Sequence, residues 1–343
     1  MWRKYRWTVV CGGLFLAGAA GNASARAGAN PAAIALRGDA SASLAAAQRQ
    51  FNSGNYTNAI GTLQSALAGN SQNAEIQYWL GRSYYELRDY DNAQPAAEKS
   101  VALAPQNSLY HQWLGRIYGG KADQDHSFFT ARKVKKEFEM AVQLNPSNIS
   151  ARRDLEEYCL EAPMIVGGSK DEAKAQVDAI AALDPMEGHL ARGAFYSREK
   201  KPDLAEKEYR EVLNSSPARL DPYLEVADFF ESENKSADMS AAVEAGAQKT
   251  GNDPRLAYYR GASRVLGGTE PSQAEAYLKA YLASTPQRSD WPSHASAREW
   301  LGQLYESQGK PADAAEQYRA ALQLNPEMKA ARLHLEKLEK ASR

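Results

Sequence analysis

The sequence predicts an all-α protein, a solenoid of about eight antiparallel helix pairs, and three observations support this. A seven-residue segment containing Trp-Leu-Gly and ending in Tyr occurs at 78–84, 112–118 and 299–305. Prolines recur at the ends of helical stretches, and small and aromatic residues recur at helical spacing between them. Self-similarity at a period near 34 residues is typical of one supersecondary unit used many times.

The proline pattern divides the chain into units. Proline cannot continue a helix, and it moves the preceding residue out of the helical region. The intervals between these prolines, 32 to 41 residues, are long enough for two helices each. The prolines that mark unit ends are Pro105, Pro146, Pro185, Pro217, Pro254, Pro286 and Pro326.

The first element, residues 1–25, resembles an export signal. Arg3, Lys4 and Arg6 give a positive start, an apolar run of about 13 residues follows, and Ala23-Ser24-Ala25 has the small-x-small pattern of a cleavage site. The run is shorter than the roughly 20 residues that span a bilayer. We therefore expect an exported, periplasmic protein. The alternative is an uncleaved anchor, which places the repeats in the same compartment.

Residues 26–41 predict a flexible linker because they are rich in Ala and Gly and lack aromatic residues. The repeat array is predicted over 42–326, and a charged amphipathic helix over 327–343 is expected to cap it, since repeat arrays need a polar terminal unit. The expected units are 40–73, 74–107, 108–148, 149–186, 187–219, 220–254, 255–288 and 295–328.

The C-terminal unit shows the internal pattern most clearly. Leu301-Gly302 and Tyr305 lie on its first helix, and residues 308–311 form the turn. On its second helix Ala314, Tyr318 and Ala321 share one face. We interpret the small residues as points of close helix approach and the tyrosines as packing residues.

These motifs resemble the tetratricopeptide repeat family, whose 34-residue helix–turn–helix carries Trp, Leu-Gly and Tyr on the first helix and Ala, an aromatic, Ala and Pro on the second. The resemblance covers roughly residues 42–340. It is strong at both ends and weaker over 149–254, where the unit near 149–186 contains an insertion in which Ser169 and Glu172 resemble a capping box.

Composition and motifs exclude several classes of function. The net charge is −1, with no basic excess to indicate a nucleic-acid partner. Of the two cysteines, Cys11 lies in the signal-like segment and Cys159 on an apolar stretch, so no disulfide or paired-Cys metal site is expected. The five histidines lie in different units without metal-ligand spacing. We therefore predict no catalytic residues, no metal and no cofactor.

The resemblance implies that the helix pairs stack into a right-handed superhelical solenoid and that the first helix of each pair lines a concave binding face. Family geometry then places the residue after Leu-Gly, and residues three to four away, in the groove. Arginines at equivalent positions of adjacent units would suit bidentate contact with carboxylates. The alternative is that they are solvated or pair with local acids. The predicted groove residues are Tyr78, Arg82, Tyr85, Gln112, Arg116 and Arg152.

The predicted function is a protein–protein interaction scaffold or adaptor in the bacterial cell envelope. Its groove would hold a peptide segment or a partner subunit. By analogy with the family, the protein would associate with complexes of the envelope. One alternative is an enzyme or enzyme subunit that uses loop insertions at 123–129 and 161–169, since loops that depart from a repeat carry function. A structural spacer is the other.

Overall fold

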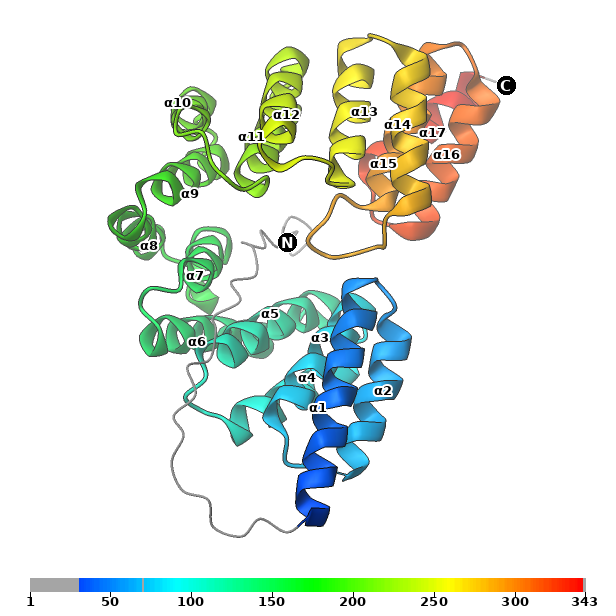
Figure 1. Cartoon of the computed structure of the whole chain (residues 1–343). Helices are drawn as coiled ribbons and strands as arrows, with labels where there is room; N and C mark the ends of the chain where they lie inside the picture. The colour runs from blue at the N-terminus through cyan, green and yellow to red at the C-terminus, as the bar shows by residue number, and fades with distance from the viewer. Residues whose placement is uncertain (1–30, 70, 342–343) are drawn as a thin grey trace. The chain divides into compact units, whose positions relative to one another are not determined.

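The computed structural model describes residues 31–69 and 71–341, so the signal predicted over 1–25 lies outside the described residues. The chain divides into two compact units, the first ending at Asp184 and the second beginning at Pro185. Every regular element of the described residues is helical, which confirms the predicted all-α array of helix pairs (Figure 1).

The described residues of the first unit form four successive helix pairs and one short 3₁₀ helix. Within each pair the two helices pack against each other, and the second helix also packs on the first helix of the next pair. The elements are α1 (Pro31–Asn52), α2 (Tyr56–Gly69), α3 (Ala74–Glu86), α4 (Tyr90–Leu103), α5 (Ser108–Asp125), α6 (Phe128–Leu144), α7 (Ile149–Glu161), η1 (Met164–Val166) and α8 (Lys170–Leu183).

From Pro185 to Ala341 the second unit has four pairs followed by a further helix, and its pairs pack in the same way. The elements are α9 (Pro185–Arg198), α10 (Pro202–Asn214), α11 (Asp221–Ser232), α12 (Ser236–Thr250), α13 (Arg255–Gly267), α14 (Pro271–Ser284), α15 (His294–Ser307), α16 (Pro311–Leu324) and α17 (Lys329–Ala341).

Asparagine begins the first helix of three pairs in the first unit. The side chains of Asn73, Asn107 and Asn148 accept hydrogen bonds from backbone N–H groups of the first turns of α3, α5 and α7. These donors have no partner within their own helix, so the caps fix where each helix starts. The capping residue predicted at Ser169 is present too, since its hydroxyl accepts from the Glu172 amide.

The turns inside the pairs use one residue in the left-handed region. Arg88, Lys200, Asn234 and Gly309 have φ of 58°, 57°, 57° and 68°. Gly309 adopts this conformation without the steric cost that a side chain adds. The proline-marked unit boundaries are confirmed, because each of the seven prolines lies between helices or at the start of one. Ala314, Tyr318 and Ala321 are fully buried in the core of the second unit.

Two predicted segments differ from the structure. The linker predicted over 26–41 is helical from Pro31 onward, because its alanines favour helix strongly even without aromatic residues to pack. The predicted loop insertion at 123–129 is instead mostly helical: α5 continues to Asp125 and α6 begins at Phe128. His126 in the left-handed region and the capping Ser127 make the reversal in two residues.

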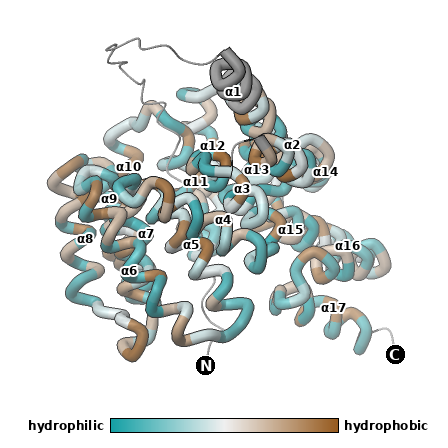
Figure 2. Tube along the Cα trace, turned by 90° about the horizontal axis from the view of Figure 1, so that it is seen from below, coloured by the Kyte–Doolittle hydropathy of each residue, from teal (hydrophilic) through white to brown (hydrophobic). Residues whose placement is uncertain are grey.

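Hydrophilic and hydrophobic residues alternate along the helices, as Figure 2 shows. In the part of the chain that the structure describes, no helix combines the length and the apolar character that crossing a bilayer requires.

Candidate functional site

Arg82 lies at the centre of an aromatic cluster in the first unit. It is on α3 and 8% exposed, and aromatic residues of α1, α3 and α5 surround its guanidinium carbon. A guanidinium over the face of an aromatic ring is attracted by the ring quadrupole. The distances to the ring centroids are 4.7 Å for Phe51, 5.5 Å for Tyr78, 4.6 Å for Trp79 and 4.2 Å for Trp113.

The polar contacts of Arg82 are few for a buried cation. Its Nη1 donates a hydrogen bond of 3.1 Å to the Tyr78 hydroxyl, while Nε is buried without a hydrogen-bond partner. Among the described residues, no carboxylate forms an ion pair with Arg82. Buried charges are usually paired, because removing them from water is costly. The guanidinium of Arg82 therefore keeps a buried donor, Nε, that no described residue satisfies.

The two predicted groove tyrosines belong to the same cluster. Tyr78 stacks on Tyr110 with ring centroids 5.0 Å apart. Tyr85 contacts Tyr90 and Trp113 edge-on, each with centroids 5.7 Å apart. Such aromatic pairs contribute about 0.5–1.5 kcal/mol beyond the area they bury. They fix the walls around Arg82 in place.

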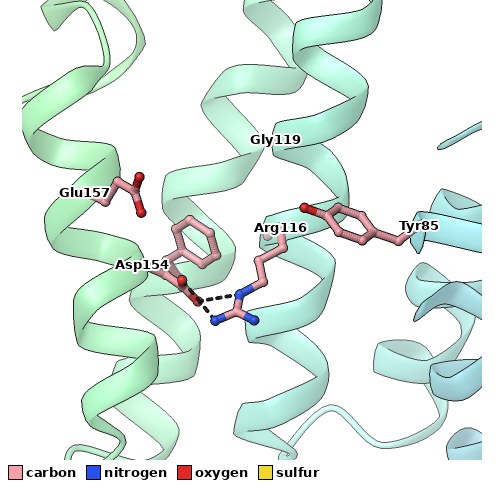
Figure 3. Close-up of a pocket in the computed structure, with 7 residues that line it drawn as sticks. Tyr85, Arg116, Gly119, Asp154 and Glu157 are labelled. Atoms are coloured by element: carbon pink, nitrogen blue, oxygen red, sulfur yellow. Dashed lines mark hydrogen bonds and ion pairs between the residues drawn. The ribbon is translucent and has the colours of Figure 1, made fainter. Parts of the chain in front are cut away.

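Arg116, the second predicted arginine, is ion-paired inside the protein (Figure 3). Its Nε and Nη2 donate to the two carboxylate oxygens of Asp154 on α7, at 2.8 and 3.1 Å. Gln112 donates to the same carboxylate at 2.7 Å and to the Ser150 hydroxyl at 2.8 Å. The charge of Arg116 is thus neutralised by the next helix pair, whereas that of Arg82 is not.

A small pocket lies beside this ion pair (Figure 3). It has space for about one or two water molecules, well below the 300–1,000 Å³ of typical small-molecule sites. We therefore interpret it as a packing gap. Its lining residues are Tyr85, Gly115, Arg116, Gly119, Phe138, Asp154 and Glu157.

The structure does not bring Arg152 into this cluster. Its guanidinium donates to the Pro146 carbonyl at 2.8 Å and to the Gln176 side chain at 2.8 Å. Burial lowers its pKa. On α7 the acids Asp154, Glu156 and Glu157 are at most 8% exposed, and Asp154 is the one that pairs with Arg116. The divergent sequence of this pair has no Leu-Gly marker from which its register could be read.

The same register rule identifies acidic positions in the second unit that sequence reasoning missed. Gln303 follows Leu301-Gly302, and Glu299 lies four residues before it. Like α15, α11 is the first helix of its pair, and it contains Asp228 and Glu231. The rule that predicts Arg82 and Arg116 as groove residues also predicts Glu299 as one, in the repeat at 295–328.

The carboxyl groups of these residues hold protons unusually tightly. Burial, together with the charges of Asp228 and Glu299, raises the pKa of Glu231 to about 8. Its Oε2 is buried without a hydrogen-bond partner among the described residues. Asp228 is exposed by surface area, yet desolvation still raises its pKa to about 7. Glu231 is half-buried, and this burial is the main cause of its raised pKa.

Glu231→Gln is expected to make the protein less sensitive to alkaline pH. A carboxyl whose pKa is about 8 when folded and near 4.5 when unfolded holds its proton preferentially in the folded state, so stability falls as pH rises between these values. The variant should raise Tm at pH 8.5 by about 2 °C relative to wild type and by less at pH 5. Thermal unfolding at both pH values measures this. Glu327→Gln, at an exposed position, is the control; equal shifts in both variants would contradict the explanation.

Cys159 shows no sign of nucleophilic activation. It is 1% exposed, and burial raises the pKa of its thiol to about 12. A reactive thiol needs an electropositive, partly exposed setting. Within residues 31–69 and 71–341, no group of three His, Cys, Asp or Glu side chains has the arrangement of a metal site.

Comparison with known proteins shows what the chain resembles. A sequence model described as Tetratricopeptide repeat matches residues 44–118 and 259–329. Among curated protein sequences, none matches the chain. The yeast Tom70 structure gives a TM-score of 0.58 at 16% identity, over 84% of this chain and 58% of Tom70. This identity supports the fold alone.

Two further solved structures resemble the chain less closely in backbone. The Cut9–Hcn1 hetero-tetramer of APC/C gives a TM-score of 0.49 at 12% identity, over 86% of this chain and 55% of that one. A thermophilic TPR protein of Thermus thermophilus gives 0.46 at 22% identity, over 56% of this chain and 98% of that one.

Proposed function

The chain is a tetratricopeptide repeat protein, and from this premise we propose that it is an interaction scaffold that binds an acidic segment of a partner protein at Arg82. Its fold is that of protein–protein interaction scaffolds. The binding of an acidic segment at Arg82 is proposed because two equivalent arginines differ in their partners. Arg116 forms an ion pair with Asp154, whereas Arg82 forms no ion pair with a described residue.

The chemistry of Arg82 favours a carboxylate over other ligands. A guanidinium presents five donors in a planar fork that matches carboxylate oxygens. Among the described residues, only Tyr78 accepts a hydrogen bond from this fork. The aromatic rings around it lower the local dielectric, which strengthens a charge-assisted hydrogen bond. An Asp or Glu side chain, or a chain terminus, would satisfy these donors.

Arg82→Met is expected to weaken binding of acidic peptides by about 10- to 100-fold. A hydrogen bond to a charged group contributes about 1.5–3 kcal/mol, and Met keeps the aromatic packing around the site. A random peptide display library selected on the immobilised chain should be enriched in Asp and Glu. The selected peptides should bind more tightly than counterparts in which Asn and Gln replace Asp and Glu.

The control for this experiment is Arg319→Met, which removes an arginine whose side chain is 56% exposed on α16. This variant should retain peptide affinity. The proposal fails if the selected peptides lack acidic enrichment, or if Arg82→Met and Arg319→Met bind acidic peptides equally well.

We also propose that this scaffold works in the periplasm, with envelope complexes as its setting. The support is the pattern of residues 1–25, with its positive start, short apolar run and Ala23-Ser24-Ala25. The mass of the protein recovered from a periplasmic fraction tests this, since cleavage after Ala25 removes that segment.

No observation favours the enzyme alternative. The segments 123–129 and 161–169 expose the apolar residues Phe129, Met164 and Ile165, and the exposed Asp125 is paired with Lys121.

A further inference from the structure

The segment 161–169 of the first unit packs against the first turns of α6. Arg132 on α6 donates from Nη2 to the Ile165 carbonyl of η1 at 3.2 Å, and Lys135 donates to the Gly167 carbonyl at 3.0 Å. The Tyr158 hydroxyl contacts the carbonyls of both Ala131 and Val166 at 2.7 Å. Val166 itself is buried. These contacts hold η1 on α6 in one position.

Four large apolar side chains project from this junction. Their exposed fractions are 47% for Phe128, 82% for Phe129, 88% for Met164 and 68% for Ile165. We call these four residues the apolar tip. A side chain that is more than 80% exposed touches little of its own protein, so Phe129 and Met164 protrude into solvent. Clustered exposed apolar residues mark interaction sites.

Exposed cations flank the apolar tip. Arg132, Lys133 and Lys136 follow Phe129 on α6, and the structure places all three at the surface. Arg132 bonds the Ile165 carbonyl, and Lys133 lies 5.0 Å from the Tyr118 ring centroid. Among the described residues, no acid forms an ion pair with any of the three.

Neighbouring acids are already engaged with other lysines. Glu172 and Glu139 pair with Lys135 at 2.6 and 3.8 Å, and Asp125 pairs with Lys121 at 2.9 Å. The cations beside the apolar tip therefore keep their charge available, although the whole chain carries a net charge of −1.

We propose that the apolar tip docks on the surface of a bilayer that contains anionic lipids. Protruding aromatic and aliphatic side chains enter the boundary between headgroups and acyl chains, and adjacent Lys and Arg residues contact lipid phosphates. A protein partner requires a broad surface of about 800 Å². Protruding side chains beside unpaired cations fit a bilayer better than such a surface.

The test is co-sedimentation of the full chain with vesicles of phosphatidylglycerol and phosphatidylcholine, compared with vesicles of phosphatidylcholine alone. Wild type should bind the anionic vesicles about tenfold more strongly, and added salt should weaken this binding. Phe129→Ser with Ile165→Ser should reduce binding to anionic vesicles by about tenfold or more. Lys133→Gln with Lys136→Gln should remove most of the preference for anionic lipid.

The matched control is Leu333→Ser, which removes a 54% exposed apolar side chain on α17 and should leave vesicle binding unchanged. All variants share the same residues 1–25, so that segment does not distinguish them. Equal vesicle binding by wild type and the Phe129/Ile165 variant overturns the proposal. So does a wild type that ignores vesicles, an outcome that would assign the apolar tip to a protein partner.

Discussion

Asp154→Ala is expected to lower the free energy of unfolding by about 3–5 kcal/mol, the usual cost of removing one partner from a buried ion pair. The side chains of Arg116 and Asp154 are 6% and 10% exposed, and two hydrogen bonds join them. Arginine cannot release its proton to escape the loss. Gln112 also loses an acceptor. Urea denaturation followed by circular dichroism measures the effect.

The control is an exposed pair in the same unit. Lys174 and Asp178 lie one turn apart on α8 with side chains 64% and 61% exposed. Asp178→Ala should change stability by less than about 1 kcal/mol, because exposed pairs are screened and solvated. If Asp154→Ala costs no more than Asp178→Ala, the α5–α7 contact is not a desolvated ion pair.

A second variant separates the ion pair from the packing around it. Replacing both partners, as Arg116→Met with Asp154→Leu, should recover most of the stability lost in Asp154→Ala, since no buried charge is then stripped of its partner. Peptide binding by this double variant should match wild type if Arg82 alone recognises the acidic group.

The sequence predicted the helix pairs well because their signals are local. A Leu-Gly pair, an Ala three or four residues from an aromatic, and a proline between units each act within one or two helical turns. The same residues pack as expected: Tyr318 and Ala314 are fully buried. Extra helix length was harder to predict, because nothing between Gly119 and Ser127 distinguishes a longer helix from a loop.

The site was less predictable because its chemistry depends on contacts between repeats. Arg82 and Arg116 occupy equivalent positions of adjacent repeats, so sequence alone assigned them the same role. Asp154 distinguishes them, and it lies 38 residues from Arg116 in a repeat without a clear register. The meeting of Arg132 with Ile165 likewise joins residues 33 apart, which no local pattern indicates.

Gly302→Val is expected to destabilise the protein by about 2–3 kcal/mol, the upper part of the range for overpacking. A Cβ at Gly302 would lie 2.4 Å from Cε1 of Tyr318 on the facing helix α16. Tyr318 is fully buried and its hydroxyl donates to Glu306, so the ring has little freedom to move away. Thermal and urea unfolding should both show the loss.

Gly61→Val and Gly61→Ala provide the comparison, because Gly61 lies inside α2 and a Cβ at this position would have no neighbouring atom within 4 Å. Gly61→Ala should stabilise the helix by about 0.5–1 kcal/mol, and Gly61→Val should be near neutral, since any side chain restricts the unfolded chain more than glycine does. The difference between the stability changes caused by valine at positions 302 and 61 then measures the effect of close helix packing, separate from that of helix propensity. Equal effects of valine at positions 61 and 302 would mean that the Leu-Gly motif serves no packing role, and the physical basis for the repeat register would be lost.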